Sequence, residues 1–235
     1  MNWRPDSDLV LSTFRMIGGR RYWLLPLLPL VWLIFQGVVE VLEDDLPITA
    51  EDVQGLLIGV PLVVMAIFFG IRIIAGEIDE RSLEIAYTVP GGCERVWRTK
   101  LLCALMLLIV AEGLLALATV LFFTPFPPSA LYGALQAAMF YLVLATAFGA
   151  LFRSESAGAI ATTVVLAVNG VLTGFGDNQI RISPFWNPAA IEDADPTELL
   201  TWTVQNRIGI VLAMVAILAL GFMRANRRER MLAGG

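Results

Sequence analysis

Six long apolar runs restrict what this 235-residue chain can fold into. A helix that crosses the hydrocarbon core of a membrane, about 30 Å, needs about 20 apolar residues. The strands of a membrane β-barrel would alternate apolar and polar residues, and these runs do not. Six transmembrane helices are therefore expected, at residues 22–39, 54–75, 101–124, 129–151, 157–175 and 208–223.

Composition supports the membrane class. Hydrophobic residues make up 57% of the chain, charged residues 16%, and the mean hydropathy is +0.75. Soluble domains have about a quarter of their residues charged. We therefore predict an all-α polytopic integral membrane protein with a single transmembrane domain over residues 1–235. The first run lacks a small-residue cleavage site, so we expect it to remain as a permanent anchor.

The distribution of basic residues predicts the orientation. Lys and Arg near the ends of spans are retained in the cytoplasm. With both termini inside, 14 of the 16 basic residues are cytoplasmic, and Arg181 and Arg207 are outside. The net charge of -5 then comes from acidic outer segments, which gives no indication of nucleic-acid binding. We expect a multi-pass protein of the bacterial inner membrane whose basic clusters contact anionic lipid headgroups.

The segments outside the spans carry further helix signals. Residues 6–21 have apolar side chains on one face with arginines nearby, which predicts an interfacial helix; a tail that only sets the topology is the alternative. The outer segment 176–206 is predicted to be a small cap. Within it, Asp195, Pro196 and Glu198 indicate a helix start that continues into the last span. Proline residues 26, 29 and 61 predict kinks in the first two spans.

Small residues spaced four apart predict close helix packing at Gly55 and Gly59, Ala145 and Gly149, and Gly170 and Gly174. Cys93 and Cys103 form neither a redox pair nor a metal motif, and the chain contains no His.

Glu112 is the acidic residue placed well inside a span, where an ionised carboxylate is costly. One interpretation is a contact for substrate, proton or ion along an interior pathway, together with Gln136 and Asn169. The other is a structural acid, protonated or hydrogen-bonded to Gln136, Asn169 or Thr119.

The cytoplasmic loop at 76–100 has an ordered pattern. It contains dense charge at Glu77, Asp79, Glu80, Arg81 and Glu84, an apolar run at 85–89, a break at Pro90-Gly91-Gly92, and basic residues at Arg95, Arg98 and Lys100. This pattern indicates a short amphipathic helix followed by an elbow. A solvated loop with topology-setting charges would account for the basic residues alone.

The run Glu80-Arg81-Ser82-Leu83-Glu84, followed by Pro90 and by Arg98, Lys100 and Leu101 at the next span, resembles the membrane subunits of type 2 ABC exporters. The order of interfacial helix, six spans, this loop and a Pro-aromatic-Pro outer segment is also similar. The family pattern differs at two points: only Ser82 stands where Gly-Thr is usual, and Gly91-Gly92-Cys93 replaces an apolar-Ser-Arg turn. The resemblance implies a coupling helix at residues 80–87 that docks on an ATPase, with contacts from Glu77, Glu80, Arg81, Leu83, Glu84, Tyr87 and Pro90.

The chain has no G-x-x-x-x-G-K-[ST] phosphate-binding loop. The resemblance therefore implies a permease that is not itself an enzyme and has no cofactor of its own. A separate ABC ATPase subunit, usually in two copies, would bind ATP and Mg²⁺, and a second permease, identical or homologous, would complete the pathway for an amphipathic, drug-like or lipid-like cargo. Two other classes stay open: a non-transporting anchor or sensor subunit, and an ion-coupled carrier that uses Glu112.

Overall fold

The computed structural model describes residues 13–14, 18–42, 48–79, 92–173, 180–191 and 195–225, and the regular elements in these ranges are helical. In chain order they are η1 (Gly19–Leu27), α2 (Leu30–Leu42), η2 (Val53–Gly59), α3 (Val60–Asp79), α5 (Gly92–Phe122), α6 (Pro128–Phe152), α7 (Glu155–Leu172), η4 (Pro188–Ala190) and α8 (Pro196–Ala225). Most of the predicted interfacial helix, 6–21, lies outside the described residues.

Within these ranges, six helical stretches are long and apolar enough to cross a membrane, which confirms the predicted number. Several bounds differ from the prediction. α3 runs on to Asp79, and α5 begins at Gly92 rather than at residue 101. Arg95, Arg98 and Lys100, predicted to lie in the loop, therefore occupy the first turns of α5. The reason is that a helix continues past the hydrocarbon boundary as long as its backbone bonds are satisfied, so hydropathy alone underestimates its length.

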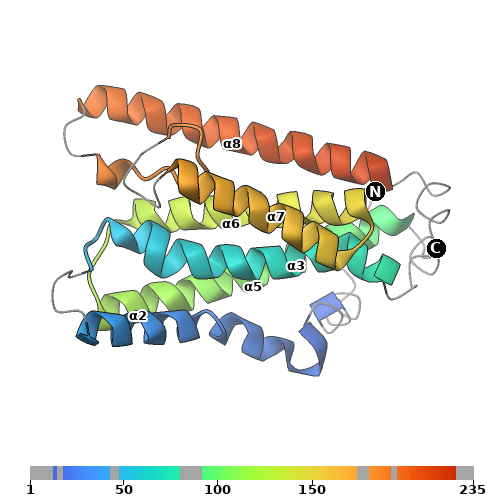
Figure 1. Ribbon diagram of the computed structural model, residues 1–235, viewed down its shortest axis with the longest axis horizontal. Coiled ribbons are helices and arrows are strands. Elements are labelled where there is room, and N and C mark those ends of the chain that lie inside the picture. Colours follow the sequence, from blue (N-terminus) through green and yellow to red (C-terminus); the bar gives the residue numbers. More distant parts are fainter. Residues whose placement is uncertain are drawn as a thin grey trace, which may run out of the picture.

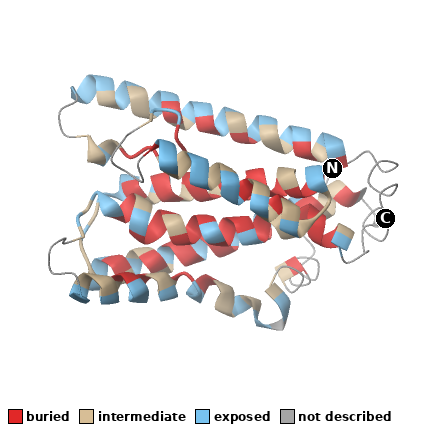
Figure 2. Ribbon diagram, in the orientation of Figure 1, coloured by how far each residue is buried: buried red, intermediate tan, exposed pale blue. Residues whose placement is uncertain are grey.

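α3 and α6 form the centre of the bundle. α3 packs most extensively against α6, while α5, followed by α2, lies on one side of this pair. α7 packs on α6 and α3, and α8 packs on α6 (Figure 1). Buried residues concentrate on α3, α5 and α6, and the outer helices show exposed faces (Figure 2). Those faces are apolar, for example Val164 on α7 and Leu212 on α8, as expected for a surface in contact with lipid.

We name the two ends of the bundle by what they carry. The loop end holds Asp79 and Gly92, which flank the segment between α3 and α5, together with Gly19 and Ala225. The opposite end is the cap end, where segment 180–191 packs against η2 and α8. Asn187 Nδ2 donates to the Glu51 carbonyl (2.9 Å), and Asn206 Nδ2 donates to the carbonyls of Arg181 (2.7 Å) and Ser183 (2.9 Å). These bonds satisfy backbone groups that an irregular segment leaves open.

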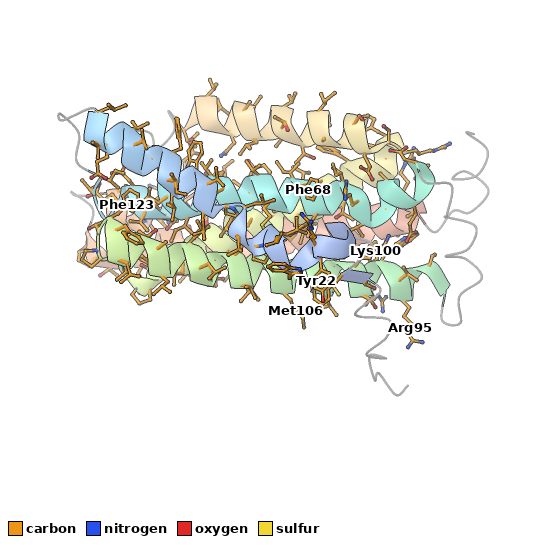
Figure 3. All side chains as sticks on the ribbon, turned by 90° about the horizontal axis from the view of Figure 1, so that it is seen from below. Tyr22, Phe68, Arg95, Lys100, Met106 and Phe123 are labelled. Atoms are coloured by element: carbon orange, nitrogen blue, oxygen red, sulfur yellow. The ribbon has the colours of Figure 1, made fainter. Side chains whose placement is uncertain are left out.

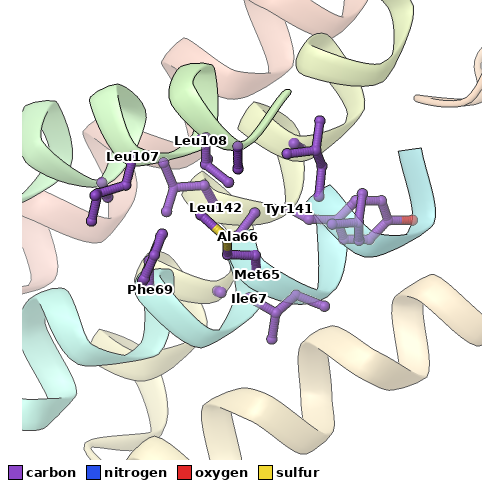
Figure 4. Close-up of a cluster of buried hydrophobic side chains, with 14 of the residues drawn as sticks. Met65, Ala66, Ile67, Phe69, Leu107, Leu108, Tyr141 and Leu142 are labelled. Carbon is purple, nitrogen blue, oxygen red and sulfur yellow. The ribbon is translucent and has the colours of Figure 1, made fainter. Parts of the chain in front are cut away.

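The central apolar cluster joins three helices. Met65 and Phe69 of α3, Leu108 of α5 and Leu142 of α6 meet in one buried group (Figure 4). The helices approach most closely where glycine replaces a side chain. A Cβ atom built on Gly70 would lie 2.5 Å from the Leu142 carbonyl oxygen. The core is therefore fixed by backbone proximity as well as by apolar side chains.

The first two spans are irregular where the prolines predict it. The first is broken between η1 and α2, next to Pro26 and Pro29, and Gly19 at its start has a φ of 69°, which glycine adopts at little cost. The second begins as a π-helix, η2, directly before Pro61. The predicted start of the last span is also confirmed, because α8 begins at Pro196 and Leu199 N donates to the Asp195 carbonyl (2.9 Å).

Candidate functional site

A buried polar cluster ties the end of α3 to the start of α5, on either side of the segment that joins these two helices. Glu77, in the last turn of α3, and Lys100, in the third turn of α5, form an ion pair with 2.8 Å between Oε1 and Nζ. Trp97 Nε1 donates to the other carboxylate oxygen of Glu77 at 3.0 Å. The residues Glu77, Lys100 and Trp97 are 6%, 5% and 0% exposed. The loop therefore leaves α3 and enters α5 at a buried, fully engaged charge pair.

Burial explains why the Glu77–Lys100 ion pair is supported by further hydrogen bonds. Removing a carboxylate and an ammonium from water is costly, and this cost is offset only when their remaining donors and acceptors are used. Both oxygens of Glu77 have partners, and Lys100 Nζ also reaches the Ile73 carbonyl (3.5 Å). In Figure 3 the side chain of Arg95 extends away from the helices, whereas Lys100 lies among them.

Glu77 is one of the residues expected to contact a partner, and that role stays a prediction. In the structure its carboxylate is buried inside the chain and paired with Lys100. Glu77 is therefore a residue that holds the loop end together. The other expected contacts, Glu80, Arg81, Leu83, Glu84, Tyr87 and Pro90, lie outside the described residues.

The loop end is also connected to α7. Asp79 Oδ2 accepts a hydrogen bond from Glu155 N (2.9 Å) at the start of α7, where backbone donors lack partners within the helix. Arg72 lies 4.0 Å from the Glu155 carboxylate, a half-exposed pair whose contribution is small. Gly76 leaves room for Glu155, because a Cβ at position 76 would lie 2.8 Å from Oε1. The last two turns of α3 thus contact both α5 and α7.

Glu112 lies on α5 and is 7% exposed. Its Oε1 is buried and has no hydrogen-bond partner. The sequence left open a hydrogen bond to Gln136, Asn169 or Thr119, and none of these bonds is present among the described residues. Thr119 Oγ1 is likewise buried without a partner. Glu112 is therefore a buried acid that no described side chain holds by a hydrogen bond.

The three residues of the proposed pathway do not form one cluster through hydrogen bonds. Gln136 on α6 accepts from Arg207 of α8, with 3.2 Å between Oε1 and NH1. Because guanidinium groups only donate, this contact directs the amide oxygen of Gln136 to Arg207 and leaves Nε2 without a described partner. Asn169 Nδ2 is also buried and unpartnered. Glu112, Gln136 and Asn169 thus lie on three helices without a mutual bond.

A second polar group, which was not predicted from the sequence, lies at the cap end. Gln54, on the π-helix η2, is 1% exposed, and its Nε2 donates to the Trp186 carbonyl (2.9 Å). Gly133 of α6 leaves the space that this side chain fills, since a Cβ there would lie 2.3 Å from Gln54 Cδ. π-Helical turns occur often at functional sites. The available signal was Gln54 itself, a polar residue opening an apolar run.

Among the described residues, no group of three His, Cys, Asp or Glu side chains is placed to hold a metal ion. Cys93 and Cys103 are both buried free thiols on α5.

Glu112→Gln tests whether the buried acid acts in transport. The substitution keeps the shape and removes the charge, so we expect the fold to remain intact. If the chain is a transport subunit that uses this acid, transport by the reconstituted protein should fall at least tenfold, because an intramembrane carboxylate that is not required for packing is expected to act on cargo or protons. Gln36→Glu gives a comparison, since it places a carboxylate at another buried polar position, on α2. Wild-type transport by Glu112→Gln would show that the acid is only structural.

Comparisons with known proteins do not add a family to this description: no protein-family model, no curated protein and no solved structure matches the chain.

Proposed function

We propose that the chain is the permease subunit of an ATP-driven exporter of the type 2 ABC class. Three features support this proposal. They are the six helices long and apolar enough to span a membrane, the resemblance of residues 80–101 to the coupling region of such permeases, and the buried cluster of Glu77, Trp97 and Lys100 at the base of the same loop, which we call the clamp. In this proposal the loop end faces the cytoplasm and an ABC ATPase subunit docks there. The ATPase binds ATP and Mg²⁺, because the chain has no phosphate-binding loop.

The Glu77–Lys100 pair is the observation that carries the proposal. A loop that transmits force needs rigid attachment at both of its ends, since a loosely attached loop would move without moving the helices. Here Glu77, Lys100 and Trp97 join the end of α3 to the start of α5, and Asp79 joins α3 to α7. A push on residues 80–91 would therefore act on three helices at once, including α3 at the centre of the bundle.

The polarity of the residues within the spans indicates the chemical class of cargo that the proposed permease would carry. Apart from the buried acid Glu112, charged side chains are sparse within the spans, and the buried polar groups of Gln54, Gln136 and Asn169 are neutral. A pathway built from such residues suits an amphipathic, drug-like or lipid-like compound. With a single bundle of six spans, a second permease copy or a homologue would supply the other wall of the pathway.

The test is charge reversal within the loop, Glu80→Lys with Glu84→Lys. Acids on a docking surface face a complementary partner, so two lysines are expected to weaken the association with the ABC ATPase at least tenfold and to remove cargo-stimulated ATPase activity. Insertion should be unaffected because added cytoplasmic lysines agree with the positive-inside rule. The measurement is copurification of an ABC ATPase together with ATPase activity in liposomes.

The matched control is Glu94→Lys, which reverses an acid at the same end but on α5, where Glu94 pairs with Arg98 at 2.9 Å. This variant should retain the ATPase. A cysteine at Thr197, labelled from outside by an impermeant reagent, checks the orientation in every variant. If no ABC ATPase accompanies the wild-type chain, the proposal fails, and an anchor subunit or a carrier that uses Glu112 becomes the better description.

A further inference from the structure

A groove runs between α6 and α8 in the half of the bundle nearest the loop end. Its volume is about 300 Å³, at the lower limit of typical small-molecule sites, about 300–1,000 Å³. Apolar side chains form nearly all of its lining. They include Leu144, Phe148 and Leu151 on α6 and Leu220 and Gly221 on α8, with Arg224 at one end.

The groove opens toward lipid. Leu220 is 65% exposed and Leu151 is 41% exposed, so its rim is uncovered on the outside of the bundle. At the floor of the groove, Gly221 allows α8 to approach α6 closely, because a Cβ there would lie 3.3 Å from Ala147 Cα. Among the described helices, α8 packs mainly against α6 (Figure 1), with a further ring contact between Phe222 and Trp97 of α5.

A cation marks the end of the groove. Arg224 is exposed and directly follows Met223, the last residue of the apolar run, which places it at the level of lipid headgroups. Its described contact is a long one, 3.4 Å from NH2 to the Leu151 carbonyl, and no described carboxylate pairs with it. Arg153 follows the end of α6, two residues beyond Leu151. The apolar groove thus ends at an arginine for which the described part of the chain provides no carboxylate.

We propose that this α6–α8 groove binds an anionic phospholipid, with one acyl chain along the apolar lining and the headgroup phosphate at Arg224. Arginine matches phosphate oxygens through its fork of N–H donors. Charge complementarity favours an anionic lipid over an apolar helix of a second copy, which would leave Arg224 without a partner. The site does not depend on the proposed transport function, because it is defined on the isolated chain.

The probe is phosphatidylglycerol that carries a photoreactive diazirine on one acyl chain, with phosphatidylcholine carrying the same chain as the uncharged comparison. The purified wild-type chain is illuminated in nanodiscs, and labelled peptides are identified by mass spectrometry. Labelling by phosphatidylglycerol is expected to concentrate on residues 144–151 and 217–224 and to exceed labelling by phosphatidylcholine. Equal labelling by the two lipids, or labelling spread evenly along α8, would overturn the proposal.

Two variants separate the groove from general lipid contact. Leu220→Trp fills the groove, whereas Leu212→Trp adds the same bulk at a position on α8 with nearly equal exposure, 65% against 64%, that does not line it. Only Leu220→Trp should remove the labelling. Arg224→Gln should weaken the preference for phosphatidylglycerol about fivefold, the effect of one basic residue near an anionic surface. Wild-type labelling in both Leu220→Trp and Arg224→Gln would refute the site.

Discussion

Lys100→Met is expected to lower the free energy of unfolding by about 3–5 kcal/mol, because it leaves the carboxylate of Glu77 buried without its cation. Glu77 would keep the hydrogen bond from Trp97 Nε1, but this neutral donor does not replace the ammonium of Lys100. The side chain of Met has similar length, so the loss is one of charge compensation rather than of volume. Unfolding of the purified chain in mixed micelles with increasing SDS measures the change.

Two further variants test the cause of this loss. Arg98→Met removes a charge from the same end of α5, but Arg98 pairs with Glu94 on an exposed face, so its effect should be only about 0.3–0.5 kcal/mol. The double variant Glu77→Gln with Lys100→Met should recover most of the stability, since a neutral Gln can still accept from Trp97. If Lys100→Met is no more harmful than Arg98→Met, the pair contributes little and the clamp is not a mechanical element.

Gly70→Ala is expected to destabilise the bundle by about 1–3 kcal/mol or more, the range for overpacking of a close-packed interior. The added Cβ would lie 2.5 Å from the Leu142 carbonyl oxygen and 2.6 Å from Ala145 Cβ. The first of these atoms belongs to the backbone, so relief requires α3 and α6 to separate. The same SDS titration measures the effect, and the intact fold can be followed by size-exclusion chromatography.

Gly113→Ala is the matched control for Gly70→Ala. Both glycines lie within long membrane helices, but a Cβ at Gly113 would meet no atom within 4 Å. Alanine there should be neutral or should stabilise α5 by up to about 1 kcal/mol through its higher helix propensity. Equal stability of the two variants would contradict the close crossing of α3 and α6.

Hydropathy was sufficient to predict the six spans because each one is a continuous local property of the sequence. Which helices touch is a long-range property, and it was only partly predictable. Gly55 was expected to pack closely, yet a Cβ there would meet no atom within 4 Å, whereas Gly70, not singled out, lies at a close crossing of α3 with α6. The spacing of small residues indicates that another helix can approach closely. Which glycine lies at the contact depends on the helix that packs against it.

The candidate site shows the same limit. The sequence identified Glu77 and Lys100 as charges of one loop, but not that they meet across it, because the helical ends extend further than the apolar runs. The partner of Gln136 was equally hidden, since Arg207 lies 71 residues further along the chain. That Glu112 lies within an apolar span could be predicted from the sequence. That its Oε1 has no hydrogen-bond partner could not, because this depends on how the neighbouring helices pack around it.

The central pairing of α3 with α6 has a consequence for the order of events during synthesis. α3 ends at Asp79, and its principal neighbour is complete only at Phe152. At about 5–20 residues per second, the intervening chain takes roughly 4–15 s to make. Glu77 and Lys100 can join α3 to α5 during this interval, before the part of α6 that packs against Gly70 has been made. We therefore expect a helical hairpin to form first and to recruit α6, which crosslinking of ribosome-bound chains from position 70 would detect as a late contact.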